Sequence, residues 1–464
     1  MDDFCKKYSG KLIGVLGLGN TGISVIKYLD SNGFKIKIWD DSANIRKKNV
    51  FRNFSFTNLN LEEKLKNIDI LFVSPGIKKD NECVNLARKF KKIIISDIDI
   101  FWNRNIKKNN YFIGVTGSNG KSTVTSLIYH IIKLSGLKSV MGGNIGIPVL
   151  NLQSADEKEI YVLELSSFQL YWINKFKPNV SILTNISPDH LDNHGSFDNY
   201  LLAKKKIFQN QSKKDIAIIN VDNTYCNRIF EELSKNKQGP KIIPISIKKI
   251  LKNGIYYRNG VLYDSVNLND YRIGKVENFT SLIGDHNKEN IVCAIAACIS
   301  LSIPVEKITS SICSYKGLPH RLEKVSTFKN ITFINDSKST NIVSCIAAIK
   351  CFKNIIWIAG GIDKNEDLGQ VSKVGKNILA GFFIGCAGEK FKNYYKKYFL
   401  SKNSIKMDKS IELAVNKALK FKKPVVILFS PACASFDQYN NFEKRGEAFV
   451  YHVKKLLKEY GKNL

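Results

Sequence analysis

Long apolar runs are missing from this chain of 464 residues. No stretch reaches the roughly 18 apolar residues that a membrane-spanning helix needs, so we expect no transmembrane segment and no membrane partner. The first residues, MDDFCKKYSGK, also lack the apolar stretch of a secretory signal peptide. These two absences predict a cytoplasmic protein.

Paired cysteine motifs are missing as well. Ten cysteines are scattered between Cys5 and Cys433, and none forms a C-x-x-C pair or a repeated metal-ligand spacing. In a long intracellular chain this favours reduced, buried thiols over disulfides or a structural zinc site. There is also no short repeat and no low-complexity tail, which excludes solenoid and array architectures.

Acidic residues are scarce relative to basic ones, with 41 Asp and Glu against 71 Lys and Arg and a net charge of +30. Lysine is nevertheless spread along the whole chain and does not form one stripe. Diffuse charge of this kind gives only non-specific attraction to nucleic acid. We therefore expect no specific nucleic-acid partner and favour a small anionic substrate.

Buried strands alternate with helical stretches in three successive blocks, and the length of the chain predicts two to four domains. The apolar runs are typical of parallel α/β sheets. The expected strands are KLIGVLGLG, KIKIWDD, IDILFVSPG and KKIIISD in the first block, YFIGV, EIYVLEL, VSILTNI and DIAIINV in the second, and ITFINDS, NIIWIAGG, LAGFFIG and VVILFSP in the third. We predict an α/β fold with domains at residues 1–105, 106–316 and 317–464.

The stretch GVTGSNGKST lies between a predicted strand and a predicted helix of the second block. Phosphate-binding loops usually read G-x-x-x-x-G-K-[ST]; here Val115 stands at the position of the first glycine. The chemistry survives this change, because glycines let backbone N–H groups face a polyphosphate and a helix N-terminus favours anions. Lys121 would reach the β- and γ-phosphates, and Ser122 or Thr123 would hold Mg²⁺.

A second glycine-rich turn, GLGNTG, follows the first predicted strand, and Asp40 and Asp41 end the second. This arrangement is typical of nicotinamide-dependent dehydrogenases. A diphosphate without any nicotinamide would fit the same turn, and many βαβ units carry such glycines for packing alone. An oxidoreductase therefore stays open as an alternative from this pattern.

Acidic, histidine and lysine side chains gather in three segments of the second block. LELSSFQL carries Glu164 at a strand end, and NISPDHLDNHGS carries His190 and His194 at a metal-like spacing. Because Mg²⁺ takes few protein ligands and several waters, most of this loop should not bind metal. YLLAKKKIF carries three consecutive lysines, of which helical geometry turns at least one toward the packed face.

Three polar loops follow strands of the third block: NDSKSTN, GGIDKNEDL and SPACASFDQYNNFEKRG. The carboxyl ends of parallel strands meet at one edge, where open α/β sheets bind ligands. The three loops therefore predict a second substrate pocket, although each taken singly is also compatible with an ordinary connection.

Taken together in this order, GVTGSNGKST, GGNIGIP, ELSSFQL, DHLD, GLPHRLE, NDSKSTN and SPACASFDQYNNFEKRG resemble the Mur ligases, in particular the members that add D-glutamate. The resemblance runs from about residue 10 to the C-terminus. It implies an N-terminal Rossmann-like domain that binds a UDP-linked substrate, a central P-loop ATPase-type parallel sheet, and a C-terminal Rossmann-like domain for the incoming amino acid. GLGNTG would then hold a uridine diphosphate.

The resemblance also implies residue roles. The UDP-substrate positions would be Gly19, Asn20, Thr21, Asp40, Ser74, Gly76 and Asn144. The ATP positions would be Gly117, Asn119, Gly120, Lys121, Ser122, Thr123, Asn287, Asn290, Arg321 and Asp336. The amino-acid positions would be Lys338, Thr340, Lys364, Ser435 and Phe442. The family often carries Asp-Thr-Arg after the second strand, where this chain has Asp40-Asp41-Ser42.

Metal and catalytic roles follow from the same resemblance. Ser122, Glu164, His190 and a carbamylated Lys204 would hold Mg²⁺, as two ions, and Lys121, Lys204, His190 and Asn144 would be catalytic. Lys205 and Lys206 would then face solvent or the phosphates. We expect a monomer whose substrates are ATP, UDP-N-acetylmuramoyl-L-alanine and D-glutamate.

Two other amide ligases are weighed against this interpretation. A folylpolyglutamate synthetase should lack the N-terminal GLGNTG domain. A Mur ligase that adds a diamino acid should carry an acidic-Asn-Pro-Arg signature in the third domain, which this sequence does not contain.

Overall fold

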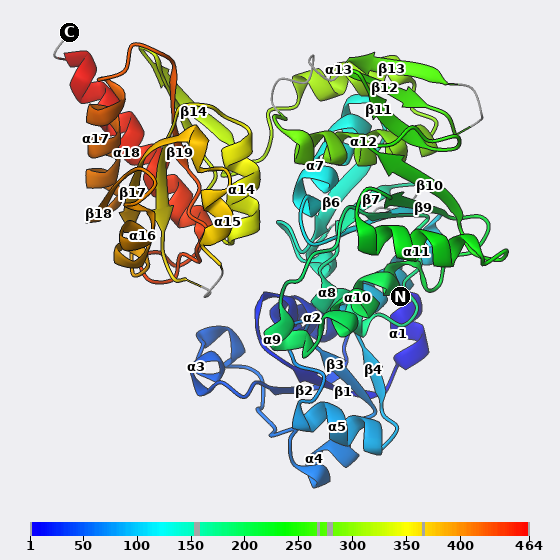
Figure 1. The fold of residues 1–464 in the computed structure, drawn as a ribbon. Helices are drawn as coiled ribbons and strands as arrows, with labels where there is room; N and C mark the ends of the chain where they lie inside the picture. Colours follow the sequence, from blue (N-terminus) through cyan, green and yellow to red (C-terminus); the bar gives the residue numbers. More distant parts are fainter. Residues whose placement is uncertain (1, 153–157, 267–269, 276–281, 364–366, 463–464) are drawn as a thin grey trace. The chain divides into compact units, whose positions relative to one another are not determined.

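The computed structural model describes residues 2–152, 158–266, 270–275, 282–363 and 367–462, which form three mainly parallel sheets flanked by helices (Figure 1). This confirms the predicted α/β class. The chain divides into two compact units, Met1–Asn278 with Glu289–Tyr315, and Phe279–Lys288 with Lys316–Leu464. The domain limits at 105/106 and 316/317 stay a prediction.

The first sheet has four parallel strands in the order β2-β1-β3-β4. All four coincide with the predicted apolar runs: β1 Leu12–Leu16, β2 Lys35–Trp39, β3 Ile70–Val73 and β4 Ile93–Ile95. Helices cover both faces, and they are α1 Asp3–Tyr8, α2 Asn20–Ser31, α3 Ala43–Arg46, η1 Asn49–Phe51, α4 Glu62–Lys66, α5 Glu82–Lys89, α6 Asp97–Asn105 and η2 Ile106–Lys108.

The second sheet has nine strands in the order β13-β12-β11-β10-β9-β8-β5-β7-β6. The strands are β5 Tyr111–Thr116, β6 Ser139–Gly143, β7 Ile160–Glu164, β8 Val180–Leu183, β9 Ile216–Asn220, β10 Lys241–Ser246, β11 Ile255–Arg258, β12 Val261–Asp264 and β13 Tyr271–Lys275. Strands β5 to β11 run parallel, and β12 and β13 are antiparallel additions. The β11–β12 hairpin turns at Asn259-Gly260, both with positive φ, a hairpin signal that the strand prediction did not use.

The helices of this part are α7 Lys121–Leu134, η3 Val149–Asn151, α8 Ser167–Trp172, α9 Leu191–His194, α10 Phe197–Lys205, η4 Lys206–Phe208, α11 Thr224–Ser234, α12 Asp285–Ser300 and α13 Val305–Ser314. The first two sheets share one core. Phe101 of α6 packs edge-on against Phe112 of β5 and Tyr161 of β7, at 6.2 and 5.0 Å between ring centroids. This continuity joins the N-terminal and central sheets in one compact unit.

The third sheet has the order β14-β15-β19-β16-β17-β18, with β14 antiparallel at one edge. Its strands are β14 Glu323–Phe328, β15 Ile331–Asn335, β16 Ile355–Gly360, β17 Ile378–Ile384, β18 Leu400–Ile405 and β19 Val425–Phe429. Its helices are α14 Ile342–Lys350, α15 Gly369–Ser372, η6 Gly375–Asn377, α16 Gly388–Tyr395, α17 Met407–Ala418 and α18 Phe442–Lys462. Helices α17 and α18 pack on one face and α14 and α16 on the other, which is a doubly wound arrangement.

None of the helices in the described part of the chain combines the length and apolar character needed to cross a bilayer.

Candidate active site

At two positions of the glycine turn after β5, the backbone conformation and the close neighbours allow only glycine. Gly117 has φ 150°, and a Cβ there would come 2.0 Å from Thr184 Oγ1. Gly120 has φ 85°, and a Cβ there would come 2.2 Å from Asn290 Oδ1. The turn therefore passes close to two neighbouring elements, as the glycine spacing predicts.

Hydrogen bonds with the segment after β8 stabilise the turn. Thr184 Oγ1 donates to the Asn119 carbonyl at 2.6 Å, and the Asn119 N–H donates to Asn185 Oδ1 at 2.9 Å. Ser118 Oγ donates to the Ser187 carbonyl at 3.0 Å. Sequence analysis missed these supporting residues, because they lie far along the chain from the turn and carry no motif of their own.

Helix α7 begins directly after the turn, with Gly120 at its N-cap and no side chain capping it. The first N–H groups of a helix have no intrahelical partner and favour an anion. Ser122 and Thr123 are buried in this first turn. The arrangement is that of a phosphate-binding site.

Two lysines converge on one carbonyl of this turn. Lys121 Nζ donates to the carbonyls of Gly117 and Ser118, both at 2.9 Å, and Lys204 Nζ donates to the Gly117 carbonyl at 2.7 Å. Lys204 is 1% exposed and its Nζ lies 4.6 Å from the centre of the Tyr200 ring. Burial, and then the charge of Lys121, lower the pKa of Lys204 well below its ordinary value.

The three consecutive lysines have distinct surroundings. Lys205 pairs with Glu232 at the surface. Lys206 Nζ donates to the Tyr171 carbonyl at 2.6 Å, so the expectation that it faces solvent or the phosphates is wrong. The reason is that α10 ends at Lys205 and the chain continues as a tighter 3₁₀ turn. Lys204 is the lysine that faces the glycine turn.

Glu164 ends β7 beside this turn with a carboxylate that is only partly satisfied. Its side chain is 2% exposed, and Oε1 accepts from Asn144 Nδ2 at 2.7 Å. Oε2 is buried and has no hydrogen-bond partner among the described residues. A buried carboxylate oxygen without a partner is costly unless a cation meets it.

Within the described ranges no cluster of three or more His, Cys, Asp and Glu side chains could hold a metal ion. Mg²⁺ keeps several waters and takes one or two carboxylates, so its binding does not require such a cluster. The unpartnered oxygen of Glu164 and the hydroxyl of Ser122 are the side-chain donors that fit it.

The two histidines of the following loop differ. His190 has φ 53°, its ring lies 4.9 Å from that of Phe168, and Nε2 is 3.5 Å from Asp189 Oδ2. His194 is buried, its Nε2 is bonded to Ser167 Oγ at 3.0 Å, and burial lowers its pKa to about 4. His194 is therefore neutral and structural, while His190 stays half-exposed.

The glycine turn after β1 is braced by Asp40. Its carboxylate accepts from the N–H groups of Leu18 and Ser42, at 2.8 and 2.9 Å, one on each oxygen. Ser74 Oγ likewise donates to the Gly17 carbonyl at 2.7 Å. Asp40 and Ser74 therefore stabilise this turn through hydrogen bonds to the backbone.

The side of this turn that faces outward has room for a ligand. Gly19 is the N-cap of α2 with no capping side chain, and a Cβ added there would meet no atom within 4 Å; Gly76 is equally open. Asn20 and Thr21 form the first residues of α2. Arg46 of α3 lies 4.4 Å from the centre of the Trp39 ring and donates to the Asp41 carbonyl at 3.1 Å.

In the second unit, residues from three loops meet at one sheet edge. The buried guanidinium of Arg445 donates to the carbonyls of Ser337 and Cys433 at 2.9 and 3.0 Å, and to that of Gly360 at 3.5 Å. The first two carbonyls belong to the loops after β15 and β19, and Gly360 is the last residue of β16, where the third loop begins. The convergence predicted for the three loops is therefore present, and Arg445, which sequence analysis did not single out, holds them together.

The residues predicted to bind the incoming amino acid lie in or beside these loops. Lys338 Nζ lies 3.7 Å from the centre of the Phe442 ring, Ser435 is buried and Thr340 is half-buried. Lys364 lies outside the described residues. Lys338 carries an ammonium group and Ser435 a hydroxyl, and both groups can donate hydrogen bonds.

The remaining predicted nucleotide residues are divided between the units. Asn290 is buried beside Gly120 in the first unit. Asn287, Arg321 and Asp336 belong to the second. Asp336 accepts from Ser430 Oγ at 2.9 Å, and burial raises its pKa to about 7.

The chain matches two family descriptions. Residues 115–298 match the Mur ligase middle domain, and residues 11–96 match the N-terminal domain of MurD-like Mur ligases.

Similar sequences span nearly the whole chain. The UDP-N-acetylmuramoylalanine–D-glutamate ligase of Rickettsia prowazekii is 39% identical over 448 residues, covering 96% of this chain and 98% of its own. The ligase of the same name from Caulobacter vibrioides NA1000 is 35% identical over 464 residues, covering 98% of both.

Solved structures are similar in fold at lower identity. UDP-N-acetylmuramate-alanine ligase MurC from Thermotoga maritima has a TM-score of 0.58 at 18% identity, covering 96% of this chain and 99% of that one. MurF ligase from Thermotoga maritima, solved in complex with ADP, has a TM-score of 0.55 at 16% identity, covering 85% and 91%.

Proposed function

This chain belongs to the Mur ligase family, and we propose that it joins D-glutamate to UDP-N-acetylmuramoyl-L-alanine with hydrolysis of ATP to ADP. The observation that carries the proposal is similarity to D-glutamate ligases over 94–98% of the chain, including both the glycine turn and the third-sheet loops. The N-terminal match at residues 11–96 speaks against a folylpolyglutamate synthetase and against the nicotinamide alternative.

ATP would bind at the glycine turn after β5. The N–H groups at the start of α7 would meet its phosphates, and Lys121 would exchange its bonds to the Gly117 and Ser118 carbonyls for phosphate oxygens. Asn290, buried beside Gly120, would border the nucleotide. The other residues with a proposed ATP role are Asn119, Ser122, Thr123, Asn287, Arg321 and Asp336.

The reaction has two steps. The L-alanyl carboxylate attacks the γ-phosphorus of ATP, the bond to the β-phosphate oxygen breaks, and an acyl phosphate and ADP result. The amine of D-glutamate then attacks the acyl carbon, phosphate leaves, and the nitrogen loses a proton. Phosphoryl transfer depends on positioning and charge neutralisation, which Lys121 and the N-terminus of α7 provide.

Mg²⁺ would be held by Glu164, Ser122 and His190, and when bound it neutralises phosphate charge during transfer. The buried Oε2 of Glu164, unpartnered among the described residues, is the feature that best fits a cation. Asn144 orients this carboxylate through its bond to Oε1, and it would also meet the reacting end of the substrate.

Lys204 would carry a carbamate. CO₂ adds to the neutral amine, and burial together with Lys121 favours that form. The resulting carbamate would be an anion beside Lys121 and Mg²⁺, where opposite charge stabilises it. The unmodified ammonium would repel both.

The other substrates would bind at the two remaining sheet edges. The uridine diphosphate would meet a set of residues on and beside the turn after β1, namely Gly19, Asn20, Thr21, Asp40, Ser74 and Gly76, of which Asp40 and Ser74 also bond to the backbone of this turn. D-Glutamate would meet Lys338, Thr340, Ser435 and Phe442, together with Lys364. We further propose a cytoplasmic, monomeric enzyme with domains at 1–105, 106–316 and 317–464.

The test is phosphate release from ATP by the purified chain in Mg²⁺ buffer. Release should require both UDP-N-acetylmuramoyl-L-alanine and D-glutamate, and L-glutamate should not replace the D-isomer, because a wrong isomer leaves a pocket donor unpaired. Equal release with either isomer would remove the D-glutamate assignment. Micromolar binding of NADH without binding of UDP-sugar would restore the oxidoreductase alternative.

A further inference from the structure

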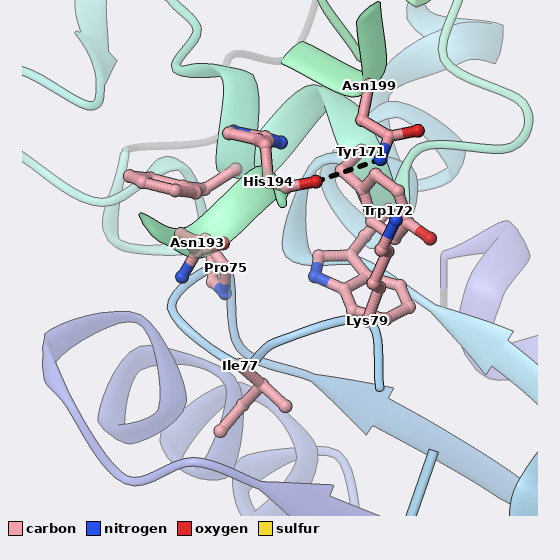
Figure 2. A pocket seen from close by; sticks show the side chains of 9 residues that line it. Pro75, Ile77, Lys79, Tyr171, Trp172, Asn193, His194 and Asn199 are labelled. Atoms are coloured by element: carbon pink, nitrogen blue, oxygen red, sulfur yellow. Dashed lines mark hydrogen bonds between the residues drawn. The ribbon is translucent and has the colours of Figure 1, made fainter. Parts of the chain in front are cut away.

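The pocket between helices α8, α9 and α10 and the loop after β3, which carries Lys79, is too small to bind a substrate (Figure 2). Its volume is about 10 Å³, which is about the space that one water molecule needs. Asn199, which lines it, donates from Nδ2 to the His194 carbonyl at 2.9 Å. The pocket therefore reflects packing inside the first unit, whereas the turn at His320 in the second unit brings together groups that bear on the reaction.

His320 lies in a turn with an unusual backbone. Its φ is 61° and that of Leu322 is 46°, so both lie in the left-handed region that residues other than glycine rarely adopt. Arg321, which has a proposed ATP role, stands between them. Such conformations persist only where surrounding contacts fix them, and they gather at functional sites. The contacts that fix His320 are therefore a guide to its role.

The backbone of His320 is bonded through both its N–H and its carbonyl. The N–H donates to Glu323 Oε2 at 2.9 Å, and the carbonyl accepts from the Lys338 N–H at 3.1 Å. Lys338 belongs to the loop after β15 and has a proposed role in binding D-glutamate. The second bond therefore ties the backbone of a proposed substrate residue to the turn at His320.

The imidazole of His320 is held in one tautomer. The side chain is 12% exposed, and Nδ1 lies 2.9 Å from Asn335 Nδ2. Asn335 Oδ1 accepts from the Ser337 N–H at 3.2 Å, and Nδ2 also donates to Glu323 Oε2 at 3.1 Å and to the Gly446 carbonyl at 3.3 Å. These partners identify Nδ2 as the amino group of the amide. His320 Nδ1 must therefore accept, and the ring proton lies on Nε2.

The same ring packs on the first turns of α18. Its centre lies 6.5 Å from that of the Phe442 ring, at an interplanar angle of 79°. A Cβ on Gly446, four residues further along the helix, would come 2.3 Å from His320 Nδ1. Glycine at 446 therefore lets the imidazole approach the helix on the face that also carries Phe442. The Phe442 ring in turn lies 3.7 Å from Lys338 Nζ.

We propose that His320 is a positioning residue for D-glutamate, which fixes Lys338 and Phe442 without touching the substrate. This inference rests on the proposed function. Lys338 is held through its N–H, and Phe442 is held by the imidazole, whose orientation is set by the bond from Asn335. Removing the ring would let Phe442 shift, together with the Lys338 ammonium that lies over it.

The first test compares two substitutions of His320. His320→Ala keeps the Cβ and removes the ring. It should raise the KM for D-glutamate about tenfold, which corresponds to about 1.4 kcal/mol and to about one lost hydrogen bond. The KM values for ATP and for the UDP substrate should stay within about twofold. His320→Asn should restore the KM for D-glutamate to within about threefold of wild type, because asparagine offers an acceptor near the place of Nδ1 and tolerates a left-handed backbone.

Two further variants separate the ring from the turn. Gly446→Ala leaves the turn unchanged and must displace the imidazole, so it should also raise the KM for D-glutamate, although alanine is the better helix former. Lys316→Ala, at an exposed residue of the same segment, is the control and should change none of the three KM values. Thermal unfolding of each variant shows whether it is folded, and Gly446→Ala still tests the proposal if His320→Ala does not fold.

Three outcomes would overturn the proposal. They are a wild-type KM for D-glutamate in His320→Ala and Gly446→Ala, an equal KM increase for all three substrates, and a His320→Asn variant as impaired as His320→Ala. The ¹⁵N shifts of the imidazole, assigned by their loss in His320→Asn, give a readout without turnover, and a ring protonated on Nδ1 would also overturn it. A wild type without D-glutamate-dependent phosphate release would instead refute the proposed function.

Discussion

Replacing Lys204 by methionine should stabilise the fold and destroy activity, and the stabilisation should depend on pH. Methionine keeps most of the side-chain volume and removes a buried amine. Burial, and then Lys121, lower the pKa of this amine in the folded protein. In the unfolded chain its pKa is about 10.4, so over the interval between the two values the unfolded state binds one more proton than the folded state.

The sign follows from this difference. Because the unfolded state binds the extra proton, wild-type stability rises with pH across the interval, by at most about 1.4 kcal/mol per pH unit for one proton. Lys204→Met lacks this titration. Its stability advantage over wild type should therefore be largest near neutral pH and shrink as the pH approaches about 10. Burial also lowers the pKa of Lys206. Because this residue is present in both proteins, its contribution cancels in the difference between their stabilities.

The measurement is the free energy of unfolding of both proteins by urea at several pH values, in buffer depleted of CO₂ so that no carbamate forms. A difference between the two proteins that stays constant with pH would mean that Lys204 is protonated in the folded state. The neutral-amine argument for carbamylation would then be wrong.

The catalytic activity of alanine variants provides a second test of the role of Lys204. Lys204→Ala should lose most activity and regain part of it with added acetate, which can occupy the place of the carbamate. Lys205→Ala is the matched control, since its surface pair with Glu232 contributes at most about 1 kcal/mol. Acetate should not rescue Lys121→Ala, which lacks a cation. If Lys205→Ala lost the most activity of these variants and acetate did not rescue Lys204→Ala, the assignment of the carbamate to Lys204 would be contradicted.

Three further variants test neighbouring features. Gly120→Ala should abolish ATP binding in a calorimetric titration, because a Cβ there would lie 2.2 Å from Asn290 Oδ1 at φ 85°; wild-type affinity would show that the turn does not cradle phosphate. Asn144→Ala removes a donor from buried Glu164, so it should lower the free energy of unfolding by about 1–3 kcal/mol and raise the Mg²⁺ concentration for half-maximal rate; an unchanged Mg²⁺ requirement would separate Glu164 from the metal. Ser435→Ala should raise the KM for D-glutamate and leave that for ATP unchanged, and the reverse pattern would assign its loop to the nucleotide.

Local sequence was sufficient for features that depend on neighbouring residues. Apolar runs bounded by glycine or polar residues identified most of the parallel strands, since strands buried on both faces need apolar residues throughout. The turn at residues 114–123 could be recognised because a strand, a glycine turn and a helix follow one another directly. The Asn259-Gly260 hairpin carries an equally local signal. It was not predicted because its two strands are half-polar and do not form continuous apolar runs.

Tertiary structure decided everything that depends on which distant segments meet. Helical spacing requires one of the three lysines 204–206 to face inward, but only the packing of α10 against the glycine turn selects Lys204. Asp40 has the sequence position of a ligand-binding carboxylate, and the fold turns both of its oxygens to backbone N–H groups. The pocket around Lys79 joins the loop after β3 to helices far along the chain, and Arg445 gathers three separate loops. Each outcome is set by burial and hydrogen bonding between elements, which the order of residues along one element does not contain.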